Sequence, residues 1–164
     1  MRFAWLAIAF FSCAATSYDG ATFKRDKLSY QTGRLGPEWK RIRVEDANLA
    51  FKHQNGGAIV CNAICGDNDI RDVPLDVLIN QSLFGVEDQN EISREALKLD
   101  SRAAVRTHVS GTLDGVSIDL DLVVMKKDNC TFDFQLVTTP GTFAARQPDF
   151  EQFFQGFRKI SGEQ

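Results

Sequence analysis

The chain has 164 residues, of which 43% are hydrophobic and 25% are charged, and its formal net charge is −3. This length and composition predict one globular domain with its own core, and they exclude a disordered or low-complexity chain. The weak acidity argues against nucleic acid as a partner, because binding to phosphates needs a basic face. The basic runs at 24–27 and 40–43 are short, and we interpret them as solvated surface.

The N-terminus has the pattern of a secretion signal. Arg2 precedes an uninterrupted apolar run, 3–11, which has the length of a signal h-region and is too short to span a bilayer. The next segment, FFSC at 10–13, resembles a bacterial lipobox, in which Cys13 is acylated and becomes the first residue of the mature chain. Ordinary signal cleavage after residue 14 or 15 is the alternative, because small residues stand there too.

We therefore expect a signal peptide over 1–13, a flexible tether over 14–27 and a single folded domain over 28–160. The tether segment has no clear hydrophobic period and, fully extended, reaches roughly 45 Å. This organisation predicts secretion across an inner membrane, with the domain in the periplasm or lipid-anchored at the outer membrane.

The first half of the domain predicts strands and one helix. Strands are expected at 28–30, 48–52 and 58–64, with Asn55-Gly56-Gly57 as a hairpin turn between the last two. Pro74 is expected to open an amphipathic helix that ends at Gly85. The apolar stripe of this helix has helical spacing: Leu75, Leu78, Ile79, Ser82 and Leu83.

The second half predicts an antiparallel meander. Four segments are expected as strands: 95–99, 103–113, 118–124 and 130–138. Asp114-Gly115 is a strong two-residue hairpin signal between two of them. In the third segment apolar residues alternate with Asp119 and Asp121, so we expect one buried face and one wet face.

A second helix closes the domain, and we expect Pro148 to open it. Its phenylalanines lie at i, i+3, i+4 and i+7: Phe150, Phe153, Phe154 and Phe157. This stripe is either a face that packs on the sheet or a partner-binding face, and burial favours packing because each buried Phe contributes about 1.5–3 kcal/mol. The expected fold class is α+β, a mostly antiparallel sheet with helices packed on it.

These elements resemble the PsbP-like fold, an α/β/α sandwich. The resemblance rests on the strand at Tyr30, the turn at Trp39, the "PLDVLINQSLFG" helix, the meander from 103 to 138 and the closing "FEQFFQGFRKI" helix. The photosystem extrinsic protein, a Ran-GTPase release factor and the DcrB-type bacterial lipoproteins share this fold. The local sequence of the first helix and of the hairpins over 114–137 is similar to that of bacterial lipoproteins. The resemblance spans 28–160, implies a non-enzymatic binding or accessory module in an envelope compartment, and carries over no catalytic residue.

Three cysteines remain after Cys13, and an oxidising compartment favours one disulfide among them. Cys61 and Cys65 would stand about 13 Å apart on one strand, which is too far for a bridge. Spacing alone does not fix the pairing, but both Cys65 and Cys130 lie at strand ends, so we predict the Cys65–Cys130 disulfide and a buried, free Cys61. A zinc site is the weaker alternative, because no second Cys pair lies nearby.

No motif in the chain predicts catalysis, a metal or a cofactor. His53 and His108 lack metal-ligand spacing, and the loop at 66–69 lacks the later ligands of a calcium loop. Asp119 and Asp121 share a strand face as paired acids would, but strand surfaces are often lined this way.

The leading functional hypothesis is thus a non-catalytic, secreted or membrane-tethered envelope lipoprotein that binds a protein partner or assists assembly. One alternative is a carrier of a small apolar ligand, held between the helices and the sheet. The other is a hydrolase that uses the acid pair, or a cysteine with His108 as base.

Overall fold

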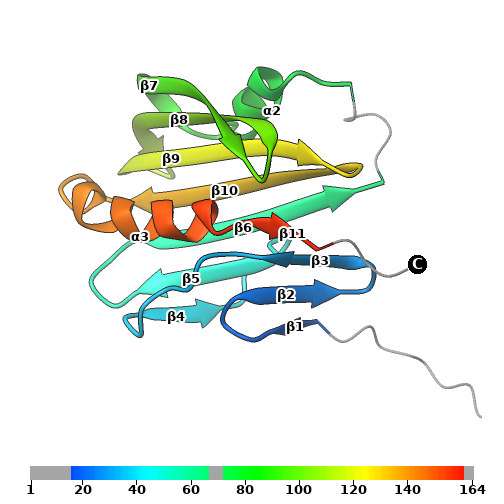
Figure 1. The fold of residues 1–164 in the computed structure, drawn as a ribbon. Coiled ribbons are helices and arrows are strands. Elements are labelled where there is room, and N and C mark those ends of the chain that lie inside the picture. Colours follow the sequence, from blue (N-terminus) through cyan, green and yellow to red (C-terminus); the bar gives the residue numbers. More distant parts are fainter. Residues whose placement is uncertain (1–15, 67–71, 161–164) are drawn as a thin grey trace, which may run out of the picture.

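Antiparallel pairing organises the chain into two sheets (Figure 1). The computed structural model describes residues 16–66 and 72–160. The small sheet has the order β1-β2-β3-β11 and the large sheet the order β4-β5-β6-β10-β9-β8-β7. The strands are β1 Ser17–Tyr18, β2 Thr22–Arg25, β3 Leu28–Gln31, β4 Trp39–Ile42, β5 Leu49–His53, β6 Ala58–Cys65, β7 Glu87–Leu99, β8 Arg102–Leu113, β9 Val116–Lys127, β10 Cys130–Thr138 and β11 Arg158–Lys159.

Tight turns set the register of the large sheet. Asp114 and Gly115 connect β8 to β9 and have φ angles of 51° and 77°, the left-handed conformations that such a hairpin needs. Asp128 and Asn129 connect β9 to β10 in the same way, with φ of 48° and 59°. The predicted fold class is confirmed: the described chain is α+β, with helices packed on a mostly antiparallel sheet.

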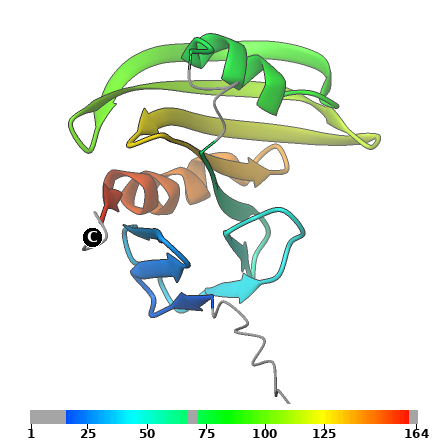
Figure 2. The same cartoon turned by 90° about the vertical axis from the view of Figure 1, so that its right-hand side faces the viewer.

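The large sheet curves around one helix and the small sheet, while the other helix lies on its outer face (Figure 2). Helix α3, Phe143–Gln155, packs against β10 on the inner face. Helix α2, Leu75–Ser82, packs against β8 and β9 on the outer face. The sheet therefore has two apolar faces and a separate hydrophobic cluster on each.

The phenylalanine stripe of α3 packs on the sheet, as expected. All four of its side chains are buried in the inner cluster, although Phe157 lies just after the last residue of α3, and Phe153 and Phe157 contact aromatic side chains of β10. The centroid of the Phe157 ring, for example, lies 4.7 Å from the centroid of the Phe132 ring and 5.3 Å from that of the Phe134 ring. Burial on this scale makes the inner face the main source of hydrophobic stabilisation.

The small sheet is attached to α3 by a backbone contact. The Gly33 N–H donates to the carbonyl oxygen of Phe153 over 2.9 Å. A Cβ atom at Gly33 would stand 2.0 Å from the carbonyl oxygen of Gln152, and one at Gly156 would stand 2.2 Å from the nitrogen of Gly33. Only glycine permits this approach, so both positions are fixed by packing.

The expectation of a flexible tether over 14–27 is wrong for its described part. Residues 17–18 and 22–25 form β1 and β2, and the folded domain therefore begins before residue 28. Phe23 is fully buried and stacks on Tyr30 of β3, with 4.9 Å between ring centroids. One apolar residue among polar neighbours gives no readable period, yet it is enough to hold a short strand against an existing core.

The expectation of a wet face on β9 is also wrong. Asp121 is fully buried on the inner face, where the Arg106 guanidinium binds its carboxylate through two donors at 2.9 and 2.7 Å. Asp119 is mostly buried and lies 3.2 Å from His108 Nε2. Each buried carboxylate has a basic partner on β8, which compensates for the hydration that it loses.

Pro148 lies inside α3 and does not open it, because the helix begins at Phe143. The ring of Phe143 stacks on His108 at 3.9 Å, and Arg146 donates to the carbonyl oxygen of Gly56. These contacts hold the first turn in place although Pro148 cannot donate a backbone hydrogen bond to it.

Candidate functional site

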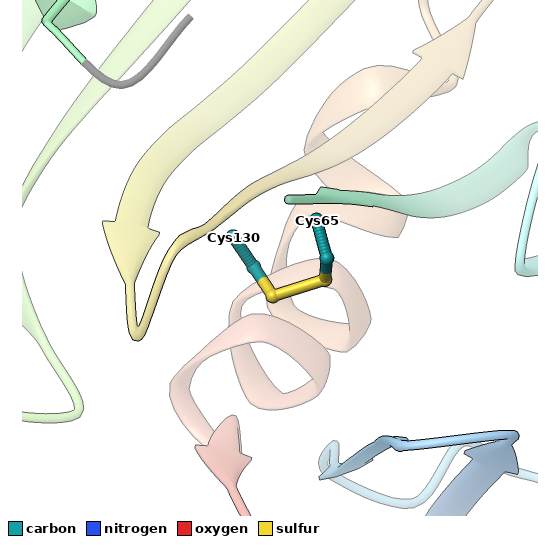
Figure 3. Close-up of a disulfide and its surroundings, with 2 residues drawn as sticks. All are labelled: Cys65 and Cys130. Atoms are coloured by element: carbon teal, nitrogen blue, oxygen red, sulfur yellow. A yellow bond between two sulfur atoms is a disulfide. The ribbon is translucent and has the colours of Figure 1, made fainter. Parts of the chain in front are cut away.

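The structure joins Cys65 to Cys130 through a disulfide, the pair that the sequence analysis selected (Figure 3). Cys65 ends β6, Cys130 begins β10, and the two are directly opposite one another in the sheet. Cys61 is a free, fully buried thiol whose Sγ lies 3.5 Å from the Tyr30 hydroxyl. Burial raises the pKa of Cys61, so this thiol stays protonated and unreactive. Cys13 lies outside the described residues.

The two histidines have structural contacts. The backbone N–H of Asn55 donates to His53 Nδ1, and the His53 ring lies edge-on to Trp39 with 5.0 Å between centroids. His108 lies between the ring of Phe143 and the carboxylate of Asp119. Each histidine thus fixes a turn or a helix end.

The hydrolase hypothesis finds no assembled site in the described chain. Cys61 and His108 lie on β6 and β8, with β10 and β9 between them, so about 14 Å of sheet separates them. Asp119 and Asp121 are each bound by a different basic side chain, and no three His, Cys, Asp or Glu side chains within 16–66 and 72–160 converge to hold a metal ion. The loop at 66–69, in which the sequence lacks the later ligands of a calcium loop, lies mostly outside these residues.

A polar cleft of about 490 Å³ lies between the C-terminal half of α3 and strands β7 and β8. Arg106 lies in this cleft, with its guanidinium 5.4 Å from the centre of the Phe154 ring and 3.6 Å from Glu95. Hydrogen bonds to Asp121 raise the pKa of Arg106 despite the opposing effect of burial. Six of the eleven lining residues are charged: Glu95, Lys98, Asp100, Arg106, Glu151 and Arg158.

This cleft does not suit the carrier hypothesis, which required an unfilled apolar pocket between a helix and the sheet. The phenylalanines of α3 fill the apolar space there. What remains beside the helix is lined mainly by charge, and burying an apolar ligand against charged groups would remove their hydration without replacing it.

Three exposed apolar residues lie near the other end of β7 and β8, and we call them the apolar corner: Phe84, Leu113 and Val116. Phe84 follows α2 and is 93% exposed, whereas Val116 and Leu113, at the β8–β9 turn, are 54% and 38% exposed. Val86 packs on Gly111, and Glu87 pairs with Thr112, so the turn after α2 is held beside that hairpin.

The turn that carries Phe84 is ordered by its own hydrogen bonds. The Gln89 side-chain amide donates to the carbonyl oxygens of Leu83 and Val86, at 3.1 and 2.9 Å. The Phe84 N–H donates to the carbonyl oxygen of Gln81, while Leu83 is buried. Phe84 is thus presented outward by a turn that is clamped on both sides.

Sequence reasoning missed this corner, although one signal was available. Phe84 stands beside Leu83 at the end of the α2 stripe, one step off the buried face. Eight of the ten phenylalanines in the described residues are buried and Phe143 is partly so, which leaves Phe84 as the exposed one. Its spacing predicts exposure, but only the structure shows which other apolar residues lie near it.

Comparisons with known proteins identify the fold. No family model matches the chain, and no curated protein does. The cyanobacterial PsbP (CyanoP) from Synechocystis sp. PCC 6803 is 13% identical, with a TM-score of 0.63 over 94% of this chain and 98% of its own. LpqN of Mycobacterium tuberculosis is 12% identical, with a TM-score of 0.56 over 89% and 90%. The Saccharomyces cerevisiae Ran-binding protein Mog1p is 7% identical, with a TM-score of 0.55 over 89% and 96%.

At these sequence identities the structural similarity establishes the fold but not the function. The likeness covers between 89% and 94% of this chain in the three cases. The described chain therefore has the PsbP-like α+β fold.

Proposed function

We propose that the chain is a non-catalytic accessory module of the bacterial cell envelope, secreted across the inner membrane and held in the periplasm or at the outer membrane by a lipid on Cys13. The leader-like pattern over 1–13 supports secretion. The Cys65–Cys130 disulfide fits an oxidising compartment. The similarity to LpqN, which is described as involved in cell envelope biogenesis, is in keeping with that location.

The proposed activity is binding of an envelope protein partner, and the apolar corner is the main observation that supports it. The 93% exposed Phe84 and the two exposed aliphatic side chains of the neighbouring hairpin turn leave apolar area in water that a partner would remove from solvent. Aromatic side chains are enriched in interfaces. The hydrogen bonds from Gln89 order the backbone of this turn before a partner binds, which lowers the backbone entropy lost on binding.

Co-purification from envelope membranes tests this activity. We expect a stoichiometric partner with the native protein and at least a tenfold lower yield with Phe84→Ala, because a truncated interface anchor typically costs about 2 kcal/mol or more. Ile64→Ala is the matched control, since Ile64 is 47% exposed at the far end of β6 and lies outside the corner. Recovery of no partner, or an equal loss with both variants, would contradict the proposal.

The intact mass of the protein purified from its native envelope tests the anchor separately. We expect a chain that begins at Cys13 and carries acyl groups. A mass that corresponds to a chain beginning at Ala15 or Thr16, without acyl groups, would show that the protein is secreted in soluble form and is not lipid-anchored. Partner binding through Phe84 does not depend on this result.

A further inference from the structure

The two basic runs of the sequence meet in one groove. Arg25 ends β2 in the small sheet, whereas Arg41 and Arg43 lie in and just after β4 in the large sheet. All three line a groove of about 470 Å³ that also includes Thr16, the first described residue. In the sequence these runs are separate and were expected to be solvated surface, but the fold brings them together. We call this site the basic groove.

The arginines of the basic groove are not neutralised by the protein. Among the described residues, no acid forms an ion pair with Arg25, Arg41 or Arg43, and none lines the groove. The guanidinium of Arg41 lies 5.5 Å from the centre of the Tyr18 ring, which orients it without cancelling its charge. Three like charges held together raise the local positive potential and favour a polyanionic partner.

Exposed aliphatic side chains accompany these charges. Ile42 and Val44 alternate with the two arginines of the β4 segment, line the same groove, and are 39% and 41% exposed. Alternating cationic and apolar side chains suit the boundary between lipid headgroups and acyl chains, where both kinds of group are satisfied. A purely ionic partner, such as a nucleic acid, would gain nothing from the apolar pair.

The charges at the two ends of the molecule are polarised in the same direction. Residues 16–53 carry eight Lys and Arg against five Asp and Glu, whereas residues 75–113, which span α2, β7 and β8, carry four against six. Strands β1 to β5, which lie in residues 16–53, gather at one end of the molecule, and α2, β7 and β8 lie at the other (Figure 1). An anionic surface would therefore attract the basic-groove end and repel the far end.

We propose that the basic groove docks on an anionic membrane surface. The arginines bind lipid phosphate groups, and Ile42 and Val44 enter the interface between headgroups and acyl chains. Docking at this end leaves the apolar corner directed away from the membrane and free for its partner. The inference goes beyond partner binding and does not need Cys13 to be acylated.

Vesicle co-sedimentation of a chain from Thr16 to Gln164 tests the proposal without an anchor, because this chain keeps every described element. The probes are vesicles of phosphatidylcholine alone and of phosphatidylcholine mixed with phosphatidylglycerol. We expect binding to the anionic vesicles only, weakening as ionic strength rises. An arginine near an anionic surface strengthens binding about fivefold. The R25Q/R41Q/R43Q variant should thus bind on the order of 100-fold more weakly.

The matched control is K98Q/R102Q/R158Q, which removes three exposed basic residues from outside the groove. It should bind like the native chain. Equal binding to neutral vesicles, or an equal loss with both triple variants, would overturn the proposal. If the groove variant fails to fold by circular dichroism, the single R43Q variant, with an expected loss of about fivefold, replaces it.

A second variant separates a membrane from a soluble polyanion. I42S/V44S should weaken binding to anionic vesicles and leave binding to a heparin column unchanged. If it leaves vesicle binding unchanged, the groove is a general anion site and the membrane assignment is wrong. Failure here would not affect partner capture through Phe84, so the two proposals can fail independently.

Discussion

The two faces of the large sheet are covered very differently. On the inner face, the thirteen residues of α3 and the four-stranded small sheet bury a continuous aromatic core. On the outer face, the eight residues of α2 cover a smaller aliphatic cluster and leave Phe84 in water. The inner face can therefore account for most of the stability, while the outer face has apolar surface left for a partner. Substitutions on the two faces should separate stability from binding.

The largest effect is expected on the inner face. Phe153→Ala removes a fully buried ring that packs on Phe51 and Phe134, and should lower the free energy of unfolding by about 3–5 kcal/mol. Val77→Ala, at an exposed position of α2, should change it by less than about 0.5 kcal/mol. Chemical denaturation measures both losses, and equal losses would contradict the larger contribution of the inner face to stability.

The buried ion pair of the inner face should be nearly as sensitive. Asp121→Ala leaves the largely buried Arg106 guanidinium without its carboxylate, and we expect a loss of about 3–5 kcal/mol. Glu95→Ala removes an exposed carboxylate from the same guanidinium and should cost less than about 1 kcal/mol. Urea unfolding of both variants measures the difference, and an Asp121 variant as stable as the Glu95 variant would show that the pair is not buried.

The disulfide should contribute an intermediate amount. It joins residues 65 apart in sequence, so its reduction should lower the free energy of unfolding by about 2–4 kcal/mol. Denaturation with and without reductant measures this, with Cys61→Ala as the control that should respond to reductant in the same way. If reductant left the free energy of unfolding of the native protein unchanged, the predicted stabilisation by the disulfide would be wrong.

Asp100 should give a smaller effect that depends on pH. Burial raises its pKa, but hydrogen bonds from the Lys127 ammonium and the Lys159 backbone N–H lower it overall. The ionised carboxylate therefore stabilises the fold above its ordinary pKa of about 3.9, and this stabilisation is lost as pH falls through the lower folded value. Asp100→Asn should cost about 1–3 kcal/mol at neutral pH.

The control for Asp100→Asn is Asp114→Asn. Both positions have positive φ in hairpin turns, 46° and 51°, which asparagine also adopts, but Asp114 forms no ion pair within the described chain. As the pH falls from neutral to about 3, the difference in free energy of unfolding between the Asp100 variant and the native protein should shrink. The Asp114 variant should show no such change. A constant difference across this range would contradict the linkage.

Strong local patterns made most of the fold predictable. The Asp114-Gly115 turn, the alternation in β9 and the phenylalanine spacing of α3 each specify an element from nearby residues alone. The same reasoning failed for β1 and β2, whose short polar strands depend on Phe23 meeting Tyr30. It also missed the first half of β7, which is exposed on both sides at the sheet edge and so has no alternation.

The candidate sites were less predictable because they depend on distant pairs. Arg106 lies fifteen residues before Asp121, and nothing in either segment alone shows that the carboxylate is buried. The basic groove combines residues from two sheets, and the apolar corner combines a helix end with a hairpin turn. Sequence identifies the side chains, but only the packed sheets show which of them are neighbours.

Photo-crosslinking in intact cells tests most directly whether the apolar surface left exposed on the outer face binds a partner. A crosslinking amino acid is placed at Phe84 in the apolar corner or, as the control, at Val77, which is 42% exposed on the preceding helix α2. We expect one envelope protein to be crosslinked from position 84 and little from position 77, with unfolding free energies within about 0.5 kcal/mol of the native value for both variants. Equal crosslinking from both positions, or none from position 84 in a folded protein, would contradict this expectation.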